Sequence, residues 1–246
     1  MADPFDSSDW WDPDGFLFGL HELLNPVRVP FVIERLRDSG ARSVLDVGCG
    51  GGFLAEAIAE QGYEVTGVDR SMTAIAAATR STFTKTRYLG ADAHRLPFAD
   101  DAFDTVVLSE VLEHVERPGV AFSEAVRVLA PGGALVITGP NRTFLSRFVL
   151  IWLAQEWPTR TLPRGLHDHH RFLQPRELAV WCHRAGLTPG VIRGVGIRAR
   201  HVPAALAAMA KLRRGAITYP QAARSIQLAE VHPPVVAYMV SASKRV

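Results

Sequence analysis

LDVGCGGG, residues 45–52, places four glycines within five positions, directly after a short apolar run. Glycines packed this densely are typical of a backbone that bends sharply and then approaches a bound molecule closely. The following segment, FLAEAIAEQG at 53–62, is rich in helix-forming residues and ends in a glycine. The stretch therefore predicts a strand, a tight turn and a helix, with a ligand lying against the turn.

The same alternation of strand and helix continues along the chain. Apolar segments typical of strands lie within 43–48, 63–71, 87–98, 104–111 and 133–141, and helical segments separate them. Short strands that alternate with helices indicate βαβ units and a parallel sheet covered on both faces. We therefore predict an α/β fold.

The composition argues against several other classes of protein. Lysine and arginine number 27 against 25 acidic residues, a net charge of +2 without a basic block, so we expect no nucleic-acid partner. The two cysteines, Cys49 and Cys182, lack CxxC spacing, which predicts no disulfide framework or zinc site and a reducing, cytoplasmic compartment. The longest charge-free apolar run, at 148–154, is far shorter than the roughly 20 residues that a membrane-spanning helix needs.

The glycine pattern and the acidic residues around it indicate the ligand. A dinucleotide loop, GxGxxG, would need a glycine where Phe53 stands, and a phosphate-binding P-loop would need a following lysine. The pattern that does fit is GxGxG, and Asp46 precedes it. An acidic residue there suits a ligand with a positive charge better than a pyrophosphate. Asp69 follows Gly48 by 21 residues and ends the second strand, where a carboxylate can accept both hydroxyls of a ribose.

Asp92 closes the third strand in the same way and can reach the edge of an adenine. Carboxylates at three successive strand ends, a glycine turn and no phosphate cradle together predict S-adenosylmethionine (SAM) as the ligand. On this interpretation Asp46, Gly48, Gly50 and Asp69 bind SAM with Asp92. The alternative, that the glycines only form a tight strand-to-helix turn, leaves the three carboxylates unexplained.

Several stretches resemble a known family. VLDVGCGGGFLAEAIAEQGYEVTGVDRS (44–71) is similar to the cofactor region of class I SAM-dependent methyltransferases. The ubiquinone-biosynthesis O-methyltransferases, which methylate polyprenyl catechols and phenols, are resembled in five further stretches: WWDPDGFLFGLHELLNPVR (10–28), LSEVLEHVERP (108–118), GPNRTF (139–144), LPRGLHDHHRFLQPREL (162–178) and YMVSASK (238–244). The resemblance covers residues 10–190 and returns in the last strand.

This resemblance implies a more detailed architecture. A Rossmann-like, doubly wound, mostly parallel seven-stranded sheet is expected, with the last strand antiparallel and helices on both faces. Helical insertions are expected after strand 5 and before strand 7. The expected organisation is a single methyltransferase domain over 1–246: an N-terminal helical cap (1–40), a donor-binding core (41–141), an apolar and basic helical insertion (142–174) and a divergent acceptor-side insertion (191–234).

The resemblance also assigns roles to individual residues. Arg28 matches the family's arginine that contacts the methyl donor, and Ser109 matches another donor-binding position, as do Gly48 and Asp69. Without the resemblance, Arg28 would be read as an arginine on a helix surface.

The segment SEVLEHV (109–115) supplies groups that can activate a phenol. If it is helical, Glu110, Glu113 and His114 lie at i, i+3 and i+4 and share one face. Two carboxylates and an imidazole can hold a divalent cation that lowers the pKa of a bound hydroxyl, and hard oxygen ligands favour Mg²⁺. The resemblance implies the same three residues as metal ligands and catalytic groups. The alternatives are a direct base role for His114 and a purely structural turn.

Three further segments concern the acceptor. The loop GLHDHHRF (165–172) groups three histidines, but such clusters are more often solvated or bonded to backbone, so we leave it outside the predicted catalytic set. Residues 142–164 predict an apolar helix with a basic border, which lies in a bilayer interface, covers a hydrophobic substrate or is an ordinary buried helix. Peripheral contact with the inner membrane face is what the resemblance implies. The segment 194–234 lacks the family's GL-x-YNP-like motif and predicts an additional helix at 202–214.

These observations together predict a SAM-dependent O-methyltransferase that acts on an aromatic hydroxyl of a hydrophobic, quinone-precursor-like substrate. A methyltransferase for another small acceptor, or a donor-binding scaffold without catalysis, is the alternative. The oligomeric state does not follow from the sequence.

Overall fold

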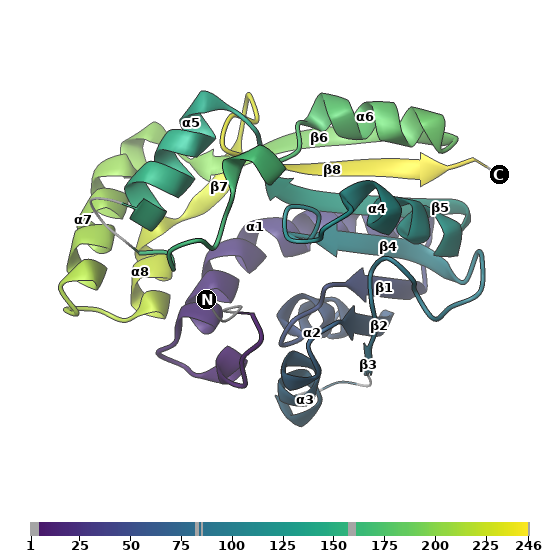
Figure 1. Ribbon diagram of the computed structural model, residues 1–246, viewed down its shortest axis with the longest axis horizontal. Helices are drawn as coiled ribbons and strands as arrows, with labels where there is room; N and C mark the ends of the chain where they lie inside the picture. Colours follow the sequence, from purple (N-terminus) through teal and green to yellow (C-terminus); the bar gives the residue numbers. More distant parts are fainter. Residues whose placement is uncertain (1–4, 82–83, 85, 157–160, 246) are drawn as a thin grey trace.

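The computed structural model describes residues 5–81, 84, 86–156 and 161–245. Within them the chain forms one eight-stranded sheet in the order β3-β2-β1-β4-β5-β8-β6-β7 (Figure 1). Neighbouring strands from β3 to β5 pair in parallel, and β8 pairs antiparallel with both β5 and β6. The strands are β1 (Ser43–Val47), β2 (Glu64–Asp69), β3 (Arg87–Gly90), β4 (Phe103–Ser109), β5 (Leu129–Pro140), β6 (Leu187–Ile197), β7 (Leu228–Val231) and β8 (Ala237–Lys244).

The predicted α/β, Rossmann-like fold is confirmed, including the antiparallel last strand, but the sheet has one strand more than the seven expected. The additional strand is β7, which lies in the 191–234 segment and pairs antiparallel with the end of β6, Gly194 opposite Val231. Its four residues are too few to carry a periodic signal. They form a strand because β6 would otherwise leave an open edge of backbone groups.

Helices cover both faces of the sheet (Figure 1). Helices α5, α7 and α8 gather at one end of the molecule, on the left of Figure 1. The α-helices are α1 (Phe16–Ser39), α2 (Phe53–Ala59), α3 (Met72–Ser81), α4 (Pro118–Val128), α5 (Phe144–Ser146), α6 (Pro175–Arg184), α7 (Val202–Arg213) and α8 (Tyr219–Ile226). A π-helix, η2 (Arg147–Glu156), continues α5, and the short 3₁₀ helices are η1 (Asp9–Trp11), η3 (His169–Arg171) and η4 (Ala199–His201). The predicted helix at 202–214 is thus present as α7. Trp157 and Arg160 of the predicted apolar and basic helix lie outside the described residues.

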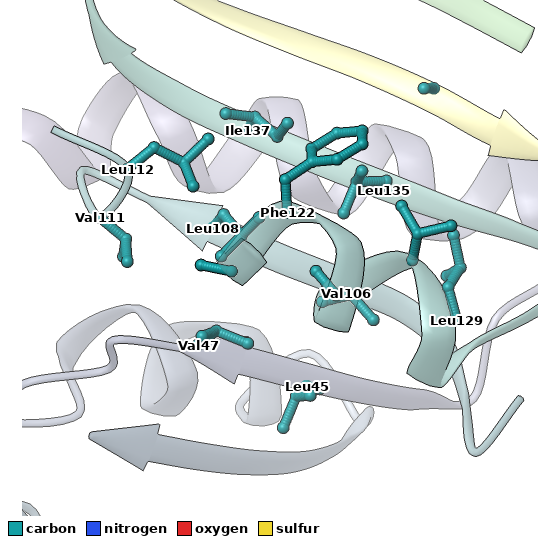
Figure 2. Packing of buried hydrophobic residues seen from close by; sticks show 14 of the residues in the cluster. Leu45, Val47, Val106, Leu108, Val111, Leu112, Phe122, Leu129, Leu135 and Ile137 are labelled. Atoms are coloured by element: carbon teal, nitrogen blue, oxygen red, sulfur yellow. The ribbon is translucent and has the colours of Figure 1, made fainter. Parts of the chain in front are cut away.

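The core consists of two apolar layers, one on each face of the sheet. Val106 and Leu108 of β4 belong to the layer that contains Phe122 of α4, whereas Val107 between them belongs to the layer that contains Phe31 of α1. Alternate residues of a strand point to opposite faces, so a strand buried on both sides is apolar throughout. Figure 2 shows the first layer, with the Phe122 ring over β4 and β5.

Helix α1 belongs to this core, although by length and composition it is long and apolar enough to cross a membrane. Charged residues such as Glu22 and Arg28 interrupt its apolar sequence, so it contains no long charge-free run. Its side chains Phe31, Val32 and Leu36 have no exposed surface and pack in the layer under the sheet. The apolar character of α1 is therefore explained by its contacts with the sheet.

Helix α8 packs against α1, and α7 packs against α8. The approach of α8 is so close that a Cβ added at Gly19 would lie 2.5 Å from Cβ of Tyr219. The Tyr219 ring also meets Phe16 edge to face, and Arg224 pairs with Glu22 at 2.9 Å. A residue without a side chain at position 19 is therefore what allows the insertion to pack against the N-terminal helix.

Candidate active site

The glycine loop lies between β1 and α2. Gly48, Gly50 and Gly52 have φ angles of +73°, +52° and +85°, the left-handed region in which glycine is unstrained. The amides of Gly48 and Cys49 both donate to the carbonyl oxygen of Val68, at 2.7 and 3.0 Å. The alternating glycines thus turn the chain sharply and hold it against the end of β2, which explains the GxGxG spacing.

Asp69 ends β2 directly beside this loop. One of its carboxylate oxygens accepts from the amide of Gly50 at 2.9 Å, and the other accepts from the amide of Ser71 at 2.8 Å. The structure therefore brings the predicted ribose carboxylate and the glycine loop together, with the carboxylate at the carboxyl end of the parallel strands. Ligands of open α/β sheets bind at this edge.

The buried Asp46 and the half-buried Arg28 belong to the predicted donor site. Asp46 is 2% exposed, and its Oδ2 has no hydrogen-bond partner among the described residues. Burial raises the pKa of Asp46 to about 7, while Arg28 lowers it and Asp69 raises it further. Arg28 of α1 interacts electrostatically with Asp46 and Glu110 and donates to Ser109 Oγ at 3.2 Å. A buried carboxyl with an unpartnered oxygen suits a ligand that brings a positive charge, as the sulfonium and amino groups of SAM do.

Asp92 lies at a more exposed position than the other predicted donor residues. The end of its strand is beside that of β2, because the amide of Ala91 donates to the carbonyl oxygen of Asp69 at 2.9 Å. The carboxylate accepts from the amide of His94 at 2.9 Å and lies 2.7 Å from its Nδ1, and these contacts lower the pKa of Asp92. Asp92 is therefore a charged group at the rim of the sheet edge that carries Asp69.

Aromatic residues of the N-terminal segment pack over the glycine loop. A Cβ added at Gly50 would lie 2.3 Å from the ring of Trp10, and Trp11 Nε1 donates to a loop carbonyl oxygen at 2.9 Å. Phe5 extends this cover to His114, with the ring centroids 5.1 Å apart. Such a cover excludes water, which strengthens the electrostatic interactions beneath it.

The segment after β4 is a turn, and the expectation of a helix there is wrong. Glu110 has a φ of +56°, and a residue in the left-handed region does not continue a right-handed helix. The amides of His114 and Val115 both donate to the carbonyl oxygen of Val111, which closes a single turn. The turn nevertheless brings Glu110 and Glu113 into hydrogen-bond contact with each other.

The two glutamates form an acid pair, in which Glu113 is buried and Glu110 half-buried. Glu113 is 6% exposed, and its Oε1 has no hydrogen-bond partner in the described part of the chain. Burial raises the pKa of Glu113 well above its usual range, and the charge of Glu110 adds to this shift. Burial also raises the pKa of Glu110, although Thr138 Oγ1, which donates to it at 2.8 Å, and Arg28 oppose the shift. Two carboxyls in contact titrate as one unit that retains a proton more strongly than either alone.

The three predicted metal ligands do not converge. Over the residues that the structure describes, no three His, Cys, Asp or Glu side chains form a group that could hold an ion. His114 Nε2 lies 3.9 Å from Glu113 Oε1, and its ring faces Phe5 and His167. Glu113 Oε2 instead faces Gly139 at the end of β5. The turn is the reason, because the i, i+3, i+4 alignment exists only in a helix.

Two residues outside the predicted set lie in this region, Tyr238 beside Glu113 and His167 beside His114. Tyr238 of β8 pairs with Gly139, and a Cβ added at that glycine would lie 3.8 Å from the Tyr238 hydroxyl and 3.6 Å from Glu113 Oε2. Burial raises the pKa of Tyr238, and Glu113 adds to this effect. His167 stacks at a tilt on His114, with centroids 5.5 Å apart. No local sequence pattern links β8 to β4, so the sequence does not indicate Tyr238. The motif GLHDHHRF is a signal for His167, but a histidine cluster on a loop predicts solvated side chains.

Comparison with known proteins shows the family of the chain. Residues 45–137 match the methyltransferase domain family. The ubiquinone biosynthesis O-methyltransferase of Xylella fastidiosa (strain 9a5c) is 40% identical over 193 residues, 74% of this chain and 74% of that protein. That of Alkalilimnicola ehrlichii is 37% identical over 193 residues, 77% of each chain. Magnesium protoporphyrin IX methyltransferase from Synechocystis PCC 6803, solved with S-adenosylhomocysteine, has a TM-score of 0.59 at 15% identity, covering 93% of this chain and 85% of its own.

The last of these similarities shows the fold, and the first three are similarities of sequence. The chain therefore belongs to the ubiquinone biosynthesis O-methyltransferase family of SAM-dependent methyltransferases.

Proposed function

We propose that the protein transfers a methyl group from SAM to a phenol or catechol hydroxyl of a hydrophobic, quinone-precursor-like acceptor. The observation that carries this proposal is the Glu110–Glu113 pair, which lies beside the donor residues Arg28 and Ser109 at the end of β4. The names of its relatives support the quinone-type acceptor.

On this proposal the residues of the donor site orient SAM rather than activate it. Bound SAM supplies an electrophilic methyl group on a positively charged sulfur. Asp69 holds the ribose, Arg28 the carboxylate, and Asp46 faces positive charge, with Gly48, Gly50, Asp92 and Ser109 completing the site. Fixing the donor in line with the acceptor oxygen contributes most of the acceleration in such a displacement.

The acid pair takes the proton of the acceptor. A phenol has a pKa near 10 and is a poor nucleophile until it loses its proton. Glu113 has a raised pKa and an unpartnered buried oxygen, so in its ionised form it is a stronger base than an ordinary glutamate. The proton from the acceptor oxygen passes to this carboxylate as the new oxygen–carbon bond forms and the sulfur–carbon bond breaks.

The proposal extends to Mg²⁺, for which Glu110, Glu113 and His114 are the candidate ligands. The unpartnered Oε1 of Glu113 beside a second carboxyl supports it, while the lack of convergence of the three side chains counts against it. Turnover that persists in excess EDTA would remove the metal from the proposal, and turnover restored only by added Mg²⁺ would support it.

We also propose that the α5–η2 segment contacts the inner face of a membrane from the cytoplasm. Phe144 is 85% exposed, and Leu145, Phe148 and Trp152 are exposed beside it. The Phe148 and Trp152 rings stack with centroids 5.0 Å apart. Exposed aromatic side chains on a helix are typical of an interfacial segment. Co-sedimentation with anionic vesicles, lost when Phe144 and Trp152 are replaced by serine, would test this contact.

A second candidate is a different small hydroxylated acceptor. It is favoured by α7 and α8, which stand where the family has a short connection, α8 packing on α1 and α7 on α8. A donor-binding scaffold is the non-catalytic alternative. The test is release of S-adenosylhomocysteine from purified protein with a short-chain prenylated catechol. Turnover would support the proposal, whereas SAM binding without turnover on any phenol would contradict it.

A further inference from the structure

His167 occupies a fixed position that its neighbours in GLHDHHRF do not share. Gln155 of η2, which is 2% exposed, binds its backbone on both sides: the amide of His167 donates to Gln155 Oε1 at 2.8 Å, and Gln155 Nε2 donates to the carbonyl oxygen of His167 at 3.3 Å. The ring packs edge to face on the buried Phe172, with centroids 5.7 Å apart. These contacts hold the imidazole in place before any acceptor binds.

The other side chains of the motif have structural partners that account for them. Asp168 accepts from the amide of His170 at 2.9 Å and so begins η3. His169 Nε2 lies 2.9 Å from the carbonyl oxygen of Thr143. His167 differs, because its Nδ1 is buried and has no hydrogen-bond partner in the described ranges. A buried polar atom left without a partner is destabilising, so its retention calls for an explanation.

The unpartnered nitrogen is near a second unpartnered atom. Glu113 Oε1, also buried and without a partner in the described chain, lies 3.9 Å from His114 Nε2, and His114 stacks on His167. Two unpartnered hydrogen-bond acceptors therefore lie next to His114, one from the turn after β4 and one from the 165–172 loop. In a neutral imidazole, Nδ1 can accept a hydrogen bond when the other nitrogen carries the proton.

We infer that His167 is a specificity-determining residue of the acceptor site, which accepts a hydrogen bond at Nδ1 from the second hydroxyl of a catechol while Glu113 receives the hydroxyl that is methylated. This inference rests on the proposed function. A catechol carries two adjacent O–H donors, which matches two buried acceptors that both lie next to His114. A monophenol fills only one of them and leaves the other unpartnered.

The experiment compares a prenylated catechol with the monophenol that lacks the second hydroxyl and carries the same tail. His167→Phe retains the ring and its packing but removes both nitrogens. We expect it to raise KM for the catechol about tenfold, the value of one buried hydrogen bond, and to leave KM for the monophenol within about twofold. The same substitution at the exposed His170 is the matched control and should change neither KM. The SAM-induced shift in melting temperature should be the same in all three proteins.

Two further variants keep the test decisive if His167→Phe does not fold. The amide of asparagine reaches the Nδ1 position, whereas that of glutamine reaches the Nε2 position. His167→Asn should therefore keep the preference for the catechol, and His167→Gln should lose it. An equal rise of KM for both acceptors would mean that His167 only packs, and would overturn the inference while the proposed function stands. A wild-type protein that binds SAM but methylates neither acceptor would overturn the proposed function and this inference with it.

Discussion

The proposed donor half of the site comes from one continuous part of the chain, whereas its proposed acceptor half comes from elements far apart in the sequence. On the donor side, Asp46, the glycine loop and Asp69 lie within one β1–α2–β2 unit, and backbone amides form most of their contacts. On the proposed acceptor side, Glu113, His167 and Tyr238 come from the turn after β4, a loop beyond η2 and the last strand. Tertiary packing places Tyr238 near Glu113 and His167 against His114.

The contrast shows where a ligand site tolerates change. Backbone conformation and strand ends form the proposed donor half, so a local sequence pattern is enough to indicate its ligand. Side chains from distant elements set the proposed acceptor half. The two halves should therefore respond separately to substitution, and four experiments test whether they do.

The largest effect is expected on the acceptor side. Replacing Glu110 and Glu113 together by glutamine should lower kcat by about 10²–10⁴-fold, because the acceptor loses the group that takes its proton. SAM affinity should stay within about threefold of wild type. Initial rates and calorimetry measure the two quantities, and Glu116→Gln, an exposed glutamate of the same turn, is the control. Full activity of the double variant would show that the acid pair is structural.

The second largest effect is expected on the donor side. Asp69→Ala should weaken SAM binding about 100-fold, because a charged acceptor of the ribose hydroxyls and of the Gly50 amide is lost. Calorimetric titration measures this, and Asp38→Ala, on the exposed end of α1, controls for a general loss of charge. Unchanged affinity would contradict the proposed donor geometry.

The pH dependence of SAM binding tests the buried part of the donor half. The pKa of Asp46 is raised to about 7, so its ionised fraction rises between pH 6 and pH 8. Because a cationic ligand favours the ionised form, the Kd for SAM should fall about tenfold across this range. The same raised pKa means that the folded state holds a proton which the unfolded chain releases, so the free energy of unfolding should decrease as pH rises from about 4 to 7. Both trends should weaken in Asp46→Asn, and a Kd that is flat with pH in the wild type would argue against contact between Asp46 and the cation.

The smallest effect concerns the packing of the insertion. Gly19→Ala places a Cβ 2.5 Å from Tyr219 and should lower the free energy of unfolding by about 1–3 kcal/mol, seen as a melting temperature several degrees lower. It should also raise KM for the acceptor while the Kd for SAM stays constant. Gly119→Ala, where a Cβ meets nothing within 4 Å, is the matched control. Equal melting temperatures would show that α8 can move away from α1 without cost.

The sequence alone predicted the α/β sheet with its helices, and it placed Asp46, the glycine loop and Asp69 at neighbouring strand ends. The reason is that βαβ units, glycine turns and strand-end carboxylates are local patterns whose geometry follows from backbone sterics. The helix expected over SEVLEHV was wrong for a related reason: periodicity assumes regular backbone, and the left-handed conformation of Glu110 interrupts it.

Which side chains lie near the acid pair depends on contacts between elements far apart in the chain. Pairing of β8 with β5 places Tyr238 beside Gly139 and Glu113, and the binding of the His167 backbone by Gln155 brings an imidazole from the 165–172 loop to His114. The strand β7 likewise exists because β6 offers it an edge. These contacts join residues far apart in the chain, and long-range packing leaves no periodic signal in the segments that it brings together.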